Sequence, residues 1–241
     1  MRDDHRPYWL RYLHDQYQLK WQKYFLEPQF ESVGEGLEAT LPWRTQVIGG
    51  NIHLGSHIHL NNHKYNITHF CTWPDENHVR GTIEIGNYVL ITPGLKIIAA
   101  RHIKIEDSVM LASDVLISDS DWHGIYDRTT PPGDGAPILI KKNAWIGQRA
   151  IIGKGVTIGE NSIIGAGSVV TKDIPDNVIA AGNPARVIKE LDMEREMITR
   201  ENMFEDPKKL HDTTQYLYKW ILQDNSLLGW IRTKLRPTKK D

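Results

Sequence analysis

The sequence predicts an all-β repeat fold, a parallel β-helix with helices at both ends, and two observations lead to this fold. An aliphatic residue recurs every six positions without a break, at Ile140, Ile146, Ile152, Ile158, Ile164 and Val170. A second, mostly small position recurs four residues after each of these, at Ala144, Ala150, Val156, Ser162, Ser168 and Ile174. Neither the roughly 3.6-residue period of an α-helix nor the alternation of a strand gives a strict period of six. The pattern is therefore typical of a structural repeat.

A triangular coil explains the period. If six residues form one short strand and one turn, three such units close a coil, and the aliphatic side chains stack inside the resulting prism. The second position is small because it lies at the tight corner beside that stack. Each strand then pairs in parallel with the coils above and below it, and the aliphatic row is buried.

The same period occurs upstream in three shorter blocks that are out of phase with one another: Ile48, Leu54 and Leu60; Ile85, Ile91 and Ile97; Ile105, Leu111 and Ile117. Residues 61–84 separate the first two blocks, and residues 118–139 separate the third from the long run. Both segments exceed a regular unit, so we expect them to leave the prism as loops. Long loops in a compact repeat domain are usually functional or disordered.

We expect residues 1–46 to form an N-terminal helical cap, residues 47–186 the β-helix, and residues 187–241 C-terminal helices and a basic tail. A helix over residues 8–26 follows from the helical spacing of Trp9, Leu13, Tyr17, Trp21 and Tyr24. Aromatic stripes of this kind usually pack, and we expect this one to cover the first coil.

Three C-terminal helices are expected: a polar helix over residues 187–203, one that continues over residues 210–222, and a short one over residues 226–235. Asp206 and Pro207 read as the N-cap and first residue of the second helix. The short helix and the tail after it combine apolar and basic residues and suit either packing on the last coils or contact with an anionic membrane. These residues are Leu227, Leu228, Trp230, Ile231, Leu235, Arg232, Lys234, Arg236, Lys239 and Lys240.

The composition limits the partners and the cellular compartment that we expect for this chain. The 241 residues carry a formal net charge of −1 with acids and bases mixed, so no global field favours nucleic acid. Cys71 is the single cysteine, which excludes an intrachain disulfide and fits a reducing compartment. No apolar leader and no run of 18 apolar residues occurs, so we expect a cytoplasmic protein that does not span a membrane.

The run of Ile-Gly-x-x-x-Ile units, together with residues 165–175 (GAGSVVTKDIP) and 181–188 (AGNPARVI), resembles the hexapeptide-repeat acetyltransferases. Within them it is most similar to the galactoside, maltose and polysaccharide O-acetyltransferase branch, over roughly residues 48–190. The resemblance implies left-handed coils, a homotrimer with active sites between neighbouring prisms, and acetyl-CoA as the acyl donor. It also implies a histidine general base and a sugar or glycan acceptor, such as a capsule or O-antigen precursor.

The branch places its base just past an aliphatic rung, where an outward loop begins, and His123 is the matching histidine. Ser120 stands where the family often has a first histidine, and Trp122 reads as an extra residue. Either Asp119 or Asp121 is a candidate to accept the other ring N–H of His123 and fix its tautomer. His102, one rung earlier, is the alternative base.

Residues for the donor and the acceptor follow from the same resemblance. Small residues suit the pantetheine arm and cations suit the phosphates, and the matching positions are Gln148, Ala166, Gly167, Thr171, Lys172, Arg186 and Lys189. Gln148 departs from the serine that is frequent in the family. The two loops offer aromatic and polar side chains that suit a sugar, namely Asn66, Trp73, Asp75 and Trp122.

Three other functions stay open. An amine in place of the hydroxyl would make the chain an N-acetyltransferase. A γ-type carbonic anhydrase needs three histidines that converge on zinc, but the spacing of the clustered histidines scatters them over different faces, so no metal site is predicted; they are His53, His57, His59 and His63. A non-catalytic β-helix protein would lack the donor motif.

Overall fold

The computed structural model describes residues 4–75, 78–129 and 135–238. The chain divides into two compact units. The β-helix unit comprises Trp21–Asn202, and the helical unit comprises Met1–Lys20 and Met203–Asp241. Part of the predicted second loop and the tail residues Lys239 and Lys240 lie outside the described residues.

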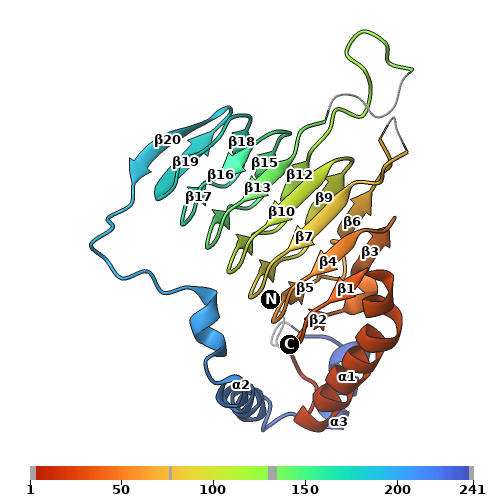
Figure 1. The fold of residues 1–241 in the computed structure, drawn as a ribbon. Coiled ribbons are helices and arrows are strands. Elements are labelled where there is room, and N and C mark those ends of the chain that lie inside the picture. Colours follow the sequence, from red (N-terminus) through yellow and green to blue (C-terminus); the bar gives the residue numbers. More distant parts are fainter. Residues whose placement is uncertain (1–3, 76–77, 130–134, 239–241) are drawn as a thin grey trace. The chain divides into compact units, whose positions relative to one another are not determined.

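Three sheets form the β-helix unit, and successive strands visit them in turn (Figure 1). Sheet A contains β1 (Ser32–Val33), β4 (Ile52–Leu54), β7 (Thr82–Ile85), β10 (His102–Ile105), β13 (Ile138–Ile140) and β16 (Thr157–Ile158). Sheet B contains β2 (Glu38–Thr40), β5 (His59–Asn61), β8 (Leu90–Ile91), β11 (Met110–Leu111), β14 (Trp145–Ile146), β17 (Ile163–Ile164), β19 (Val178–Gly182) and β20 (Ala185–Glu190). Sheet C contains β3 (Thr45–Ile48), β6 (Thr68–Thr72), β9 (Lys96–Ala99), β12 (Leu116–Ser118), β15 (Ile151–Ile152) and β18 (Val169–Val170).

The strands pair in parallel with the coils above and below, except for the antiparallel pair β19–β20. The predicted left-handed parallel β-helix is confirmed. Its aliphatic row from Ile140 to Val170 is fully buried. The small second row from Ala144 to Ile174 is buried as well, as the packing argument requires.

The sequence explains the corners. Where sheet A passes into sheet B, Asn143, Asn161 and Asn177 adopt left-handed backbone conformations with φ of 58°, 59° and 61°. Asparagine tolerates this conformation better than most residues. The three amides form a ladder, with Nδ2 to Oδ1 distances of 2.9 and 2.8 Å. Glycine is needed at position 147 because the next coil lies very close, and not because of its backbone conformation. A Cβ there would lie 2.5 Å from the carbonyl oxygen of Ile164.

Four expectations are corrected. The β-helix begins before residue 47, because β1 and β2 already pair with β4 and β5. The segment 61–84 is not one loop, since β6 lies within it and pairs with β3 and β9. The predicted polar helix over residues 187–203 is replaced by β20 and a 3₁₀ turn, Arg200–Phe204. Ile48 is exposed, and Val47 takes its place in the interior row. The reason is that the turn at Gly49 and Gly50 is one residue longer than the turn of a regular six-residue unit.

The start of the β-helix unit closes the first coil. The predicted first helix consists of α1 (Tyr8–Trp21), a π-helical turn (Gln22–Leu26) and a 3₁₀ turn (Glu27–Gln29). The buried side chain of Gln22 donates to the carbonyl oxygen of Leu37 at 2.8 Å and accepts from the N–H of Ala39 at 2.9 Å. Leu26 enters the core completely. This segment therefore satisfies backbone groups that the first coil would otherwise leave open.

The helical unit contains α1 up to Lys20, α2 (Pro207–Ile221) and α3 (Leu227–Leu235). Asp206 and Ser226 are the N-caps of α2 and α3 and accept from N–H groups at 2.9 and 3.0 Å, as predicted for Asp206. No helix in the described part of the chain is long and apolar enough to cross a membrane. Of the predicted aromatic stripe, Trp21 packs against the core and lies edge to face with Trp43, whereas Trp9, Leu13, Tyr17 and Tyr24 are exposed.

Candidate active site

Both long excursions leave the prism at the same corner, where sheet C passes into sheet A (Figure 1). We call it the C–A corner; its described residues are 73–75, 78–81, 100–101, 119–129, 135–137, 153–156 and 171–173 on successive coils. The corner where sheet B passes into sheet C is the B–C corner, and it includes residues 147–150 and 165–168. Segments that are distant in sequence thus lie on neighbouring coils.

Asp119 lies at the base of the second loop and is completely buried. Its two carboxylate oxygens accept from the N–H groups of Ala100 and Arg101, each at 2.8 Å. Burial raises the pKa of this carboxyl, and the backbone hydrogen bonds oppose the rise. Asp119 therefore holds the turn of the preceding coil, and it forms no hydrogen bond with His123 in the described residues.

The second loop closes on itself at its base. The N–H of Ala136 donates to the carbonyl oxygen of Asp119 at 2.8 Å, and Ser120 and Gly135 form an isolated antiparallel bridge. The described ends of the loop thus lie at neighbouring points and form a paired neck.

Two further contacts fix the residues just before His123. Asp121 accepts from Lys154 Nζ at 2.6 Å, and Lys154 lies on the next coil of the C–A corner. Trp122 Nε1 donates to Ser118 Oγ at 3.2 Å. His123 follows directly and is exposed, and within the described residues its imidazole forms no hydrogen bond.

The first loop, which follows β6, also contacts the residues just before His123. Trp73 follows β6, and its ring meets that of Trp122 edge to face, with centroids 6.4 Å apart and planes at 63°. Asp75 is only 8% exposed and accepts from Arg101 Nη1 at 2.6 Å. The structure therefore brings together three of the four residues expected for an acceptor, Trp73, Asp75 and Trp122, beside the loop of His123.

Arg101 is a site residue that the sequence did not single out. Its backbone N–H binds Asp119 of the second loop, and its guanidinium binds Asp75 of the first. One residue on the intervening coil thus links both loops. The only signal in the sequence is its place on the coil between them.

Asn66 lies elsewhere. It precedes β6, at the B–C corner, and its amide donates to Asp114 Oδ1 at 2.8 Å. Trp73 lies at the other end of the same strand. Within one chain, Asn66 is therefore separated from the other acceptor candidates by the width of sheet C.

The donor candidates occupy two corners and one strand. Gln148, Ala166 and Gly167 are exposed along the B–C corner, and the Gly167 N–H donates to the Gln148 carbonyl oxygen at 2.8 Å. Thr171 and Lys172 are exposed on the C–A corner. Arg186 and Lys189 lie on β20, opposite Ala181 and Ile179. A single copy of the chain does not gather all seven.

Comparison with known proteins gives the family. Residues 137–172 match the model of the bacterial transferase hexapeptide, six repeats. Galactoside O-acetyltransferase of Escherichia coli (strain K12) is 44% identical over 111 residues, which are 45% of this chain and 54% of that protein. A solved galactoside acetyltransferase in complex with coenzyme A is 31% identical with a TM-score of 0.50, and the match covers 73% of each chain. The chain belongs to the hexapeptide-repeat transferases.

A second solved structure agrees in fold. It is a variant of AntD, an N-acyltransferase from Bacillus cereus, in complex with dTDP-4-amino-4,6-dideoxyglucose and coenzyme A. It is 24% identical, with a TM-score of 0.59, and the match covers 78% of this chain and 95% of that one. At this identity the likeness shows the fold alone. The chain spans about half the length of the curated E. coli relative.

The clustered histidines of this hexapeptide-repeat transferase point to different surroundings. His53 on sheet A contacts Ser32 Oγ, and His57 at the next corner stacks on Tyr88. His59 on sheet B lies 3.2 Å from Arg200 Nη2, and burial lowers its pKa. His63 lies beside Tyr65 beyond that strand. The spacing argument for their separation is confirmed, and among the described residues no group of three or more His, Cys, Asp or Glu is arranged to hold a metal ion.

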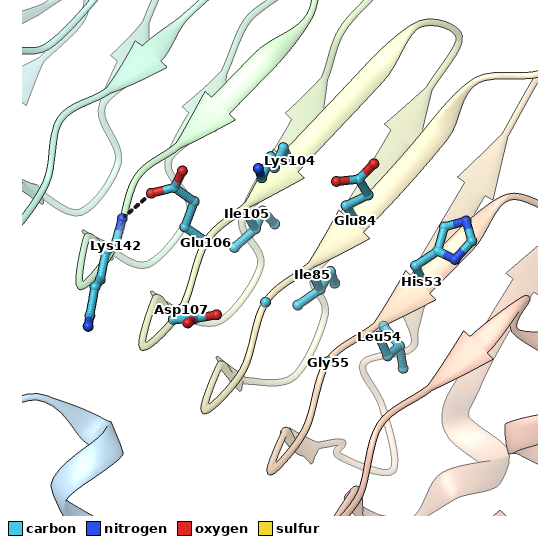
Figure 2. Close-up of a pocket in the computed structure, with 11 residues that line it drawn as sticks. His53, Leu54, Gly55, Glu84, Ile85, Lys104, Ile105, Glu106, Asp107 and Lys142 are labelled. Carbon is cyan, nitrogen blue, oxygen red and sulfur yellow. Dashed lines mark hydrogen bonds between the residues drawn. The ribbon is translucent and has the colours of Figure 1, made fainter.

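A hollow of about 630 Å³ lies on the face of sheet A, toward the corner where sheet A passes into sheet B (Figure 2). Charged side chains of both signs line it, including Glu84, Lys104 and Glu106, and the backbone N–H of Lys142 donates to Glu106 Oε2 at 3.0 Å. The C–A corner borders the opposite end of the same strands. The predicted site residues are absent from the described lining of this hollow.

Proposed function

We propose that this chain is an acetyl-CoA-dependent O-acetyltransferase that acts on a hydroxyl of a sugar or polysaccharide precursor. The observation that carries the proposal is the convergence at the C–A corner of Trp73, Trp122 and the loop of His123. Thr171 and Lys172 lie on the same corner, two coils beyond β12 by way of β15 and β18. At a strand spacing of about 5 Å, that is roughly 10 Å along the prism.

The donor residues fit the chemistry of acetyl-CoA. The solved galactoside acetyltransferase was determined with coenzyme A. In this chain the matching positions offer open backbone for a pantetheine arm, since a Cβ built at Gly167 would meet nothing within 4 Å. Lys172, Arg186 and Lys189 are exposed cations suited to the phosphates.

We infer a homotrimer, because the donor candidates are divided between two corners on either side of sheet C. A neighbouring copy that brings its C–A corner against the B–C corner would assemble Gln148, Ala166 and Gly167 with the loop of His123. The single cysteine and the donor both suit a cytoplasmic enzyme.

The reaction needs one base and one oxyanion donor. The imidazole of His123 takes the proton of the acceptor hydroxyl, and the oxygen attacks the thioester carbonyl carbon. A backbone N–H stabilises the tetrahedral oxyanion. The C–S bond then breaks, and the imidazolium returns the proton to the leaving thiolate, which yields acetyl ester and free coenzyme A. We assign Asp119 and Asp121 to positioning of the loop, because both bind other partners.

Incubation of the purified chain with acetyl-CoA and a panel of acceptors tests the proposal. The panel holds nucleotide sugars and capsule or O-antigen oligosaccharides, with matched amino sugars. We expect thiol release that depends on an acceptor hydroxyl, and an ester product that mild alkali cleaves. An amide product from the amino sugars alone would make the chain an N-acetyltransferase. Absence of acetyl-CoA binding by calorimetry would contradict the proposal altogether.

Lys154 offers a second test, which asks whether the position of the His123 loop matters for turnover. Lys154→Met removes the partner of Asp121, and we expect kcat to fall about tenfold, because small displacements of a catalytic group are costly. Both side chains are more than a third exposed, so thermal stability should change little. The double variant with Asp121→Asn should lose no more activity than either single variant. Additive losses would show that the ion pair does not act through the loop.

A further inference from the structure

In the helical unit Leu222 is buried, but several contacts between its segments are polar and many of its large apolar side chains are exposed. Arg11 lies between helices, with its guanidinium 3.7 Å from the centroid of the Tyr218 ring and 3.3 Å from Asp4. Asn225 donates to the carbonyl oxygens of Asp4 and Arg6. On α1 the stripe residues Trp9, Leu13 and Tyr17 are exposed. Helix α2 also exposes Tyr216, Leu217, Trp220 and Ile221. A soluble helical hairpin usually shows the opposite arrangement.

On α3 the exposed apolar residues form one continuous face. Its residues Leu227, Leu228, Ile231 and Leu235 fall within about 100° of the helix circumference. All four are exposed, and Leu228 and Leu235 reach 80% and 77%. Thr233 on the opposite side is buried, so the helix packs through that side. We call the four leucine and isoleucine side chains the α3 face.

Basic residues border the α3 face on both sides. Arg232 lies on one side of it and Lys234 on the other, by the same geometry, and Arg236 is the C-cap that follows the helix. Residues 225–238 contain no acidic residue. An apolar face with cations along both edges matches the boundary between acyl chains and anionic headgroups, where long basic side chains extend to the phosphates.

We propose that the α3 face docks this chain on an anionic lipid bilayer, with the helix axis in the plane of the surface. Nine residues of helix span only about 14 Å, too short to cross a bilayer. A second copy is the less suitable occupant, because an isologous pair would bring Lys234 and Arg236 of both copies together without an acid. The proposal goes beyond the transferase reaction and does not depend on it.

Sedimentation of the full chain with vesicles tests the proposal. Vesicles of phosphatidylcholine with phosphatidylglycerol should bind the chain, and vesicles of phosphatidylcholine alone should bind it much more weakly. The double variant Lys234→Glu, Arg236→Glu should weaken binding about 30-fold or more, from about 1 kcal/mol for each basic residue near the surface. High salt should weaken wild-type binding as well.

Variants of the apolar side chains complete the experiment. Leu228→Glu with Leu235→Glu should abolish vesicle binding, whereas Ile198→Glu, which alters an exposed isoleucine of the β-helix unit, should leave it unchanged. Helical circular dichroism shows whether each variant is folded. Equal binding to both vesicle types, or no binding, would overturn the proposal. A change in the mass of the Leu228→Glu, Leu235→Glu variant in solution, with unaltered vesicle binding, would also overturn the proposal. It would identify the α3 face as a contact between copies.

Discussion

Replacement of His123 by alanine is expected to lower kcat by about 10²–10⁴, while the affinity for acetyl-CoA stays within a factor of two or so. His123 is the only histidine in residues 119–129, and its exposed imidazole follows two anchored residues. The nearby carboxylates cannot replace it, since Asp119 binds two backbone N–H groups and Asp121 binds Lys154. Loss of the imidazole therefore removes the base without a substitute.

Steady-state kinetics and calorimetry with acetyl-CoA separate the two quantities. His123→Gln, which keeps a polar side chain without a base, should be as slow as His123→Ala. The matched control is His63→Ala, which removes an exposed histidine from a turn beyond β5 and should leave kcat unchanged. Normal turnover of His123→Ala would refute the assignment. A variant that fails to bind acetyl-CoA would instead place His123 in donor binding.

The sequence predicts the prism because the interior imposes one rule on every coil. Most coils fill the stack with an aliphatic side chain, with Phe70 as an exception, so the period from Ile140 to Val170 is visible without any structure. The period fails where a turn changes length, as at Gly49, and the phase then shifts from Ile48 to Val47. It also fails at β20, whose residues after Ala185 are exposed on the outer edge and carry no interior constraint. A polar exposed strand of that kind resembles a surface helix in composition.

The site is predicted less completely, because its contacts join coils. The loop segments and the residues Trp73, Trp122 and His123 follow from the resemblance and from the breaks in the period. The pairs Arg101–Asp75 and Lys154–Asp121 connect residues 26 and 33 positions apart, and only the stacking of coils brings them together. From the sequence, Asp119 is a suitable carboxylate to orient His123. In the structure it is buried and instead accepts hydrogen bonds from the backbone of the preceding coil.

Replacement of Asp119 by alanine should destabilise the β-helix unit by about 2–4 kcal/mol, because each buried N–H left without an acceptor costs about 1–3 kcal/mol. The two donors are the N–H groups of Ala100 and Arg101. Since Arg101 also holds Asp75, both loops should loosen, and kcat should fall with stability. Denaturant unfolding and kinetics measure the two effects. The control is Asp114→Ala, which removes a partly exposed carboxylate just before the other end of β12. It should lower the free energy of unfolding by less than about 1 kcal/mol.

The pH dependence distinguishes the two opposing influences on Asp119. Burial raises its folded pKa above the ordinary 3.8, so its contribution to stability is full below the unfolded pKa and is lost as pH rises through the folded pKa. The difference in unfolding free energy between the wild type and Asp119→Ala should therefore be larger near pH 4 than near pH 7. A difference that grows with pH would mean that the N–H groups of Ala100 and Arg101 outweigh burial and that the fold selects the carboxylate. Protonation of Asp119 at low pH would then weaken the hydrogen bonds that hold the loop to Ala100 and Arg101.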